Sequence, residues 1–191
     1  MALEHYSLAF TTTASVIKQW IDGICDTLNA TVTVNSWEFT FGFTINGENL
    51  TGKSYGWGSS NYPTQFDLFI EENNGSIEFL WLCANYMENQ NAIYERNGIM
   101  FAYAKDINNA KVSISLGSDM RRSIYFIWNV QYLPGEILNK PDILLVPAMR
   151  GGIVFKDIYV CPNNLFTAGL KYSDGTNTFM SLGYNFFVKI S

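Results

Sequence analysis

One segment of the sequence matches the consensus of a phosphate-binding loop. Residues Gly47 to Ser54, GENLTGKS, satisfy the pattern G-x-x-x-x-G-K-[ST] at each fixed position. In a nucleotide-binding protein the backbone amides of such a loop surround the phosphates, Lys53 would reach the β- and γ-phosphates, and Ser54 would bind Mg²⁺. That chemistry requires a helix directly after the loop, because the helix N-terminus completes the anion site.

The residues that follow Ser54 oppose such a helix. From Tyr55 to Pro63 they read YGWGSSNYP, and the two glycines and the proline disfavour a helix in its first turns. A pattern with so few fixed positions also arises by chance. We therefore expect GENLTGKS to belong to a β-hairpin, and nucleotide binding is a remote alternative.

The same stretch is a candidate interaction loop. It places Tyr55, Trp57 and Tyr62 close together among glycines and serines. Large aromatic side chains on a loop offer contact area with few rotatable bonds, so they could stack on sugar rings or anchor a protein partner. The other interpretation is that these rings fold back over the edge of a sheet, since large aromatics are usually mostly buried.

Other residues that could perform catalysis are scarce. The one histidine, His5, lies in the N-terminal segment, where chains are usually poorly anchored. No Ser/His/Asp triad, Cys/His pair or histidine-based zinc site can be built without it. The carboxylates between Asp67 and Glu78 flank a turn at Asn74-Gly75, where charged residues are usually solvated. We expect no catalytic residue, cofactor or metal, and predict that the chain is not an enzyme.

Length and composition restrict the fold and the partners. A chain of 191 residues suits one hydrophobic core, so we expect a single domain over residues 1–191. Charged residues make up only 15% of it, against about 25% in an average soluble protein, while hydrophobic residues make up 48%. The net charge of −5 opposes nucleic-acid binding. We expect part of the apolar surface to be buried against a neighbour.

Three further expectations follow from single features of the sequence. Cys25, Cys83 and Cys161 have no CxxC spacing, so buried free thiols are expected. No apolar run approaches the length of a membrane span. The first residues, MALEHYSLAFTTT, have neither a basic nor a continuous apolar region, so no secretory signal is evident and a cytoplasmic protein is expected.

The spacing of apolar residues predicts one helix followed by many strands. Between about residues 13 and 28 they recur at helical spacing, which is typical of an amphipathic helix. From about residue 31 to 190 the period changes to two, and turns such as Asn46-Gly47, Asn74-Gly75 and Asp174-Gly175 separate the segments. We expect a mainly β fold, an antiparallel β-sandwich or barrel of about nine or ten short strands.

The C-terminal quarter of the chain carries a resemblance. Leu144 to Val160 read LLVPAMRGGIVFKDIYV, and Lys171 to Ile190 read KYSDGTNTFMSLGYNFFVKI. Over roughly residues 143–190 the chain resembles tail-associated structural proteins of bacteriophages and prophages. The resemblance implies a virion component that assembles with copies of itself, as a ring, trimer or collar, or with other virion proteins, and that is located in the virion or the bacterial cytoplasm. Many tail fibres have a collagen-like or coiled-coil segment, and its absence here puts a fibre shaft in doubt.

These observations favour a non-catalytic structural or interaction protein of the phage virion type that acts through protein–protein assembly. The alternative is a carbohydrate-binding β-sandwich module, in which Tyr55, Trp57 and Tyr62 would contact a glycan. The two hypotheses differ first in oligomeric state, because assembly interfaces are large and hydrophobic.

Overall fold

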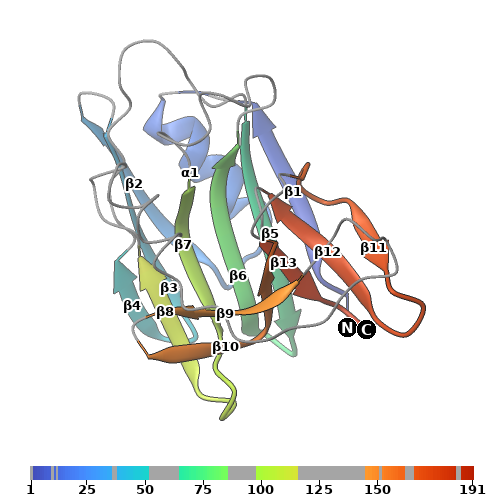
Figure 1. The fold of residues 1–191 in the computed structure, drawn as a ribbon. Coiled ribbons are helices and arrows are strands. Elements are labelled where there is room, and N and C mark those ends of the chain that lie inside the picture. The colour runs from blue at the N-terminus through green and yellow to red at the C-terminus, as the bar shows by residue number, and fades with distance from the viewer. Residues whose placement is uncertain are drawn as a thin grey trace.

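A computed structural model describes most of the chain. The described residues are 2–9, 11, 13–35, 38–51, 65–85, 98–115, 145–150, 152–161, 166–183 and 186–191. Within these ranges the chain forms one helix and thirteen strands, which pair in three antiparallel sheets (Figure 1). The expected mainly β, sandwich-like fold is confirmed.

A five-stranded sheet forms the middle layer. Its strands, in spatial order, are β1 (Glu4–Ala9), β5 (Gln65–Asn73), β6 (Ser76–Asn85), β7 (Gly98–Lys105) and β8 (Lys111–Ser115). Side chains on both faces of β6 are buried, Leu80 and Leu82 on one face and Phe79 and Trp81 on the other. The near-continuous apolar sequence of β6 therefore reflects its position in the centre of the molecule.

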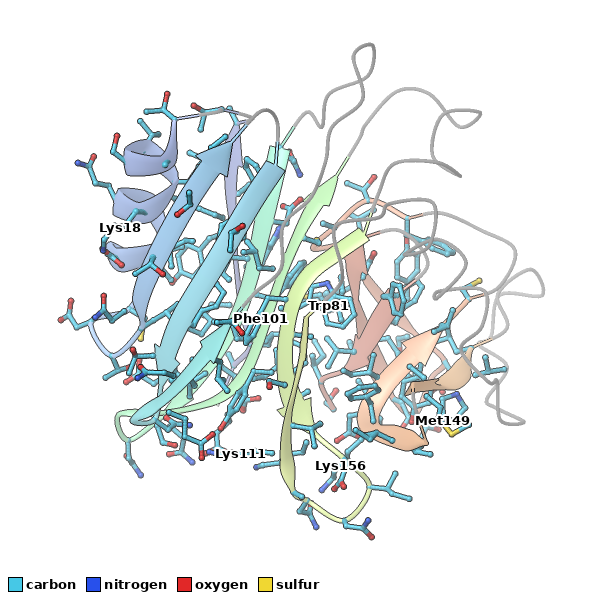
Figure 2. All side chains as sticks on the ribbon, turned by 90° about the vertical axis from the view of Figure 1, so that its left-hand side faces the viewer. Lys18, Trp81, Phe101, Lys111, Met149 and Lys156 are labelled. Carbon is cyan, nitrogen blue, oxygen red and sulfur yellow. The ribbon has the colours of Figure 1, made fainter. Side chains whose placement is uncertain are left out.

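The helix and the smallest sheet cover one face of the middle layer. They comprise α1 (Ala14–Asp22) and the strands β2 (Asn29–Asn35), β3 (Glu38–Ile45) and β4 (Glu48–Thr51). Alternate side chains of β3, Phe41, Phe43 and Ile45, are buried. The Phe43 ring centroid lies 4.7 Å from that of Phe101 in β7, so the small sheet packs directly on the middle one (Figure 2).

A second five-stranded sheet covers the opposite face. Its order is β11 (Lys171–Ser173), β12 (Thr178–Gly183), β13 (Phe186–Lys189), β10 (Ile153–Val160) and β9 (Val146–Arg150). The Trp81 and Phe186 ring centroids lie 5.1 Å apart across the interface. Cys83 Sγ donates a hydrogen bond to the Leu182 carbonyl over 3.3 Å. The second core, between the two larger sheets, is therefore also closely packed.

Several element boundaries differ from those expected from the sequence. The helix ends at Asp22 and not near residue 28, because Gly23, a poor helix former, follows it. Cys25 and Leu28 are still buried, but they lie in the turns that follow the helix. The apolar sequence from Phe179 to Ile190 favours a single strand, but the structure has two strands there, β12 and β13, that pair with each other.

The strand count is the other difference. The thirteen strands in the described ranges exceed the nine or ten expected, partly because β1 pairs along its whole length with β5. The apolar residues between 123 and 131 also favour a strand, but this segment lies outside the described residues.

Candidate functional site

A pocket of about 270 Å³ lies where the two five-stranded sheets meet at one end of the molecule. We call it the seam pocket. Strands β5, β6 and β7 contribute to its lining from the middle sheet, and β10 and β13 from the second sheet. Leu3 and Ile190, next to the two chain ends, complete it, and Figure 1 shows both ends in this part of the molecule. Its charged lining residues are Glu71, Glu78, Lys105, Lys156, Asp157 and Lys189.

An irregularity in β10 places two of these charges. The pairing of β10 with β9 changes register between Val154 and Tyr159. Within this bulge Asp157 has φ 61°, a left-handed conformation that aspartate tolerates better than most residues do. Consecutive residues of a regular strand point to opposite faces, but in β10 both Lys156 and Asp157 line the pocket.

One carboxylate of the seam pocket is neutralised by lysines of the same sheet. Glu78 Oε2 lies 2.5 Å from Lys105 Nζ, and Glu78 Oε1 lies 3.1 Å from Lys111 Nζ. The hydrogen bonds from Lys105 and then Lys111 lower the pKa of Glu78 to about 2, against a smaller opposing effect of burial. Glu78 is therefore ionised at neutral pH and joins β6 to β7 and β8.

The remaining charges of the pocket are not neutralised in this way. Lys156 Nζ donates to the neutral amide oxygen of Asn109 over 2.6 Å and has no ion-pair partner among the described residues. The charge of Lys189 contributes to the lowered pKa of Asp174, after hydrogen bonds from Asn177 and Thr176. Glu71 and Asp157 also lack a cationic partner within those ranges. The pocket thus offers two ammonium groups and two carboxylates to a bound molecule.

A second polar cluster, which we call the β1 cluster, joins strand β1 to one buried carboxylate of β5. Asp67 of β5 is fully buried, and its Oδ1 accepts a hydrogen bond from Ser7 Oγ over 2.7 Å. Gln65 Nε2 donates to the other carboxylate oxygen over 2.8 Å. His5 Nε2 lies 2.6 Å from Asp67 Oδ1. Three side chains therefore surround the buried carboxylate, two of them from β1.

Two segments distant in the chain hold His5 in place. Its ring stacks on Phe69 with the centroids 4.3 Å apart. In the turn before β11, Gly169 approaches so closely that a Cβ atom added there would lie 2.4 Å from His5 Nδ1. The expectation of a poorly anchored His5 is therefore wrong, because its partners come from residues more than sixty positions away in the chain.

Serine, histidine and aspartate also form hydrolase triads, but the β1 cluster has a different geometry. In a triad the carboxylate holds one histidine nitrogen, and the other nitrogen accepts the proton of the serine. Here Ser7 Oγ donates directly to Asp67, and the nearest histidine nitrogen, 3.4 Å away, is the same Nε2 that faces Asp67. This arrangement stabilises a buried carboxylate and attaches β1; it does not activate Ser7.

The residues that the sequence singled out lie mostly elsewhere. Tyr55, Trp57 and Tyr62 are outside the described residues, and so are Lys53 and Ser54.

The first half of GENLTGKS is described. Asn46 and Gly47 have φ of 52° and 83° and form the expected turn, and Glu48–Thr51 is strand β4, paired with β3. Amides along an extended strand do not converge on one phosphate, so this half has the expected hairpin structure.

The cysteines have the expected structural role. Cys25, Cys83 and Cys161 are all free and buried. Burial, and then a hydrogen bond from Cys25 Sγ to Glu72 Oε2 at 3.0 Å, raise the pKa of the Cys25 thiol. A raised pKa leaves less of the nucleophilic thiolate at neutral pH.

The described ranges contain neither a metal-binding cluster nor a membrane-spanning helix. There, no three His, Cys, Asp or Glu side chains lie close enough to share a metal ion. No helix in this part of the chain has the length and apolar character needed to cross a bilayer.

Comparisons with protein-family models, with curated proteins and with solved structures found no match to this chain. The function of the chain is therefore inferred from the geometry of its own residues. Sequence analysis did not identify the seam pocket, because the pocket combines strands that are distant in the chain. One sequence signal was present: Lys156 and Asp157 are adjacent charges within the otherwise apolar IVFKDIYV.

Proposed function

We propose that this chain is a non-catalytic structural or interaction protein that acts through protein–protein assembly, as a tail-associated component of a bacteriophage or prophage virion. Its partners are copies of itself or other virion proteins, and it needs no cofactor. It is located in the virion, or in the bacterial cytoplasm before assembly. One exposed apolar surface carries the assembly part of this proposal.

That surface, the tip patch, consists of Ile107 and Ile153. Ile107, in the turn between β7 and β8, is 60% exposed, and Ile153, at the start of β10, is 36% exposed. The Ile107 amide donates to the Val154 carbonyl over 3.0 Å, so the two isoleucines lie on adjoining segments. Large aliphatic side chains exposed on adjoining segments can contribute apolar area to a contact with another protein.

The region of phage resemblance supports the virion part of the proposal. Residues 143–190 include all of β9 to β13, which together form one complete five-stranded sheet. The resemblance therefore extends over a whole structural layer and not over isolated turns. The low charged fraction of 15% also suits a surface that is covered in an assembly.

Sedimentation velocity of three variants tests the tip patch. Ile107→Ser and Ile153→Ser should each weaken self-association, because they remove apolar area from the contact. Val16→Ser is the matched control, since Val16 is 42% exposed but lies on α1, in another layer. If all three variants associate as strongly as the parent, the tip patch is not part of the interface.

A further inference from the structure

We propose that the seam pocket binds a small zwitterion of the amino-acid class, a molecule with one carboxylate and one ammonium group. This inference does not depend on the assembly proposal, because the tip patch and the pocket have no residue in common. It is based on the size of the pocket, the balance of its charges and the irregular backbone that forms it.

Size limits the ligand to a small molecule. The volume of about 270 Å³ lies just below the range of about 300–1,000 Å³ that is typical of pockets for drug-sized ligands. A nucleotide or an oligosaccharide would extend beyond such a space, whereas an amino acid would fill much of it. Phe79, Val188 and Ile190 give the lining an apolar part that suits an aliphatic or aromatic side chain.

Charge determines the class of ligand. Lys105 is already paired with Glu78, so it contributes little free positive charge. Lys156 remains to bind a carboxylate, together with Lys189, whose charge also acts on Asp174 outside the pocket, while Glu71 and Asp157 remain to bind an ammonium group. A simple anion would be repelled by the two carboxylates and a simple cation by the two lysines. A zwitterion is complementary to both pairs.

The irregular backbone of β10 indicates that a specific local structure places charged side chains in the pocket. A bulge interrupts the strand at the pocket, and a residue other than glycine adopts the left-handed conformation there. Bulges redirect side chains and are frequent next to functional sites. Figure 2 shows the labelled Lys156 at the lower end of the molecule, between the yellow-green strands of the middle sheet and the orange strands of the second sheet.

Thermal unfolding and calorimetric titration with free L-amino acids, each added separately, test the proposal on the full chain. We expect at least one of them to raise the melting temperature as its concentration increases, since a ligand that binds only the folded state stabilises it. The methyl ester of that amino acid lacks the carboxylate charge, and its N-acetyl derivative lacks the ammonium charge. Both should bind at least about tenfold more weakly.

Variants locate the site. Lys156→Gln and Asp157→Asn should each weaken binding about tenfold, and asparagine tolerates the left-handed conformation, so the bulge is retained. Lys171→Gln is the matched control, because Lys171 is exposed on β11 and does not line the pocket. Circular dichroism confirms that each variant is folded.

Three results would overturn the inference. The first is the absence of any stabilisation at about 10 mM of every amino acid, a concentration well above ordinary site affinities. The second is equal binding of the ester or the N-acetyl derivative. The third is a ligand that binds the Lys156 and Asp157 variants as tightly as the Lys171 control.

Discussion

The β1 cluster and the seam pocket both lie between the two larger sheets, yet their charges are arranged in opposite ways. In the β1 cluster a single carboxylate, Asp67, is fully buried and surrounded by hydrogen-bond partners. The seam pocket gathers Lys156, Lys189, Glu71 and Asp157, and Lys156, Glu71 and Asp157 have no ion-pair partner among the described residues. The first arrangement serves the fold, and the second remains available to a ligand.

This difference follows from the energetics of polar groups. A buried charge is costly unless it is paired and hydrogen-bonded, so the partners of Asp67 are needed for stability. Groups that line an open pocket stay in contact with water and add little to stability. Substitutions in the two regions should therefore separate stability from binding.

The largest effect is expected from Asp67→Ala. Loss of the fully buried carboxylate removes three hydrogen bonds to a charged group, those of Ser7, His5 and Gln65, which should lower the free energy of unfolding by about 3 kcal/mol. Urea unfolding followed by circular dichroism measures the change. Asp26→Ala, at an exposed aspartate, is the control and should change stability by less than about 0.5 kcal/mol. Equal stability of the two variants would show that the β1 cluster does not hold the fold.

A second, smaller effect is expected from Gly169→Ala. Gly169 has φ 82°, and an added Cβ would collide with the His5 ring, so we expect a loss of about 2 kcal/mol. Gly152→Ala separates the two causes, because Gly152 has the same φ of 82° but nothing within 4 Å of an added Cβ. Its cost should be only about 1 kcal/mol, from the backbone alone. If both variants lose the same stability in urea unfolding, the contact with His5 is not a close one.

A pH titration of stability tests the ion pairs of Glu78. The pKa of Glu78 falls from 4.5 to about 2 on folding, so the ion pairs stabilise the protein above pH 4.5. That contribution, about 1 kcal/mol after screening by solvent, should be lost as the pH falls from about 4.5 to about 2. Unfolding of the parent and of Glu78→Gln at several pH values measures it. An unchanged stability difference between them over that interval would contradict the ion-pair geometry.

The smallest effect on stability is expected from Lys156→Gln. Because the hydrogen bond of Lys156 to Asn109 is exposed, the melting temperature without ligand should stay close to that of the parent, a change of less than about 0.5 kcal/mol. The same variant should lose affinity for the zwitterion. A large loss of stability in the absence of ligand would place Lys156 with the structural groups and weaken the contrast between the two regions.

Local sequence signals predicted the regular parts of the fold. The Asn74-Gly75 turn was predictable because both residues tolerate positive φ, and they adopt φ of 50° and 76°. The near-continuous apolar sequence of β6 is that of a central strand, since alternation is lost where both faces are buried. The end of the helix was missed because the apolar period continues past Gly23 into turns that are also buried.

The polar features depended on contacts that no local pattern contains. His5 meets Asp67 only because β1 pairs with β5, and the N-terminal position of His5 gave no sign of that pairing. The seam pocket forms only where the two larger sheets pack against each other. In the sequence, only the adjacent charges Lys156 and Asp157 pointed to an irregular strand. The aromatic loop with Tyr55, Trp57 and Tyr62 stays a prediction.

Assembly is the central functional claim, and the molar mass in solution tests it most directly. Light scattering across a concentration series should give a species whose mass is a fixed multiple of the 21.6 kDa chain and persists on dilution. A mass of 21.6 kDa at every concentration would contradict self-assembly and would favour a monomeric binding module.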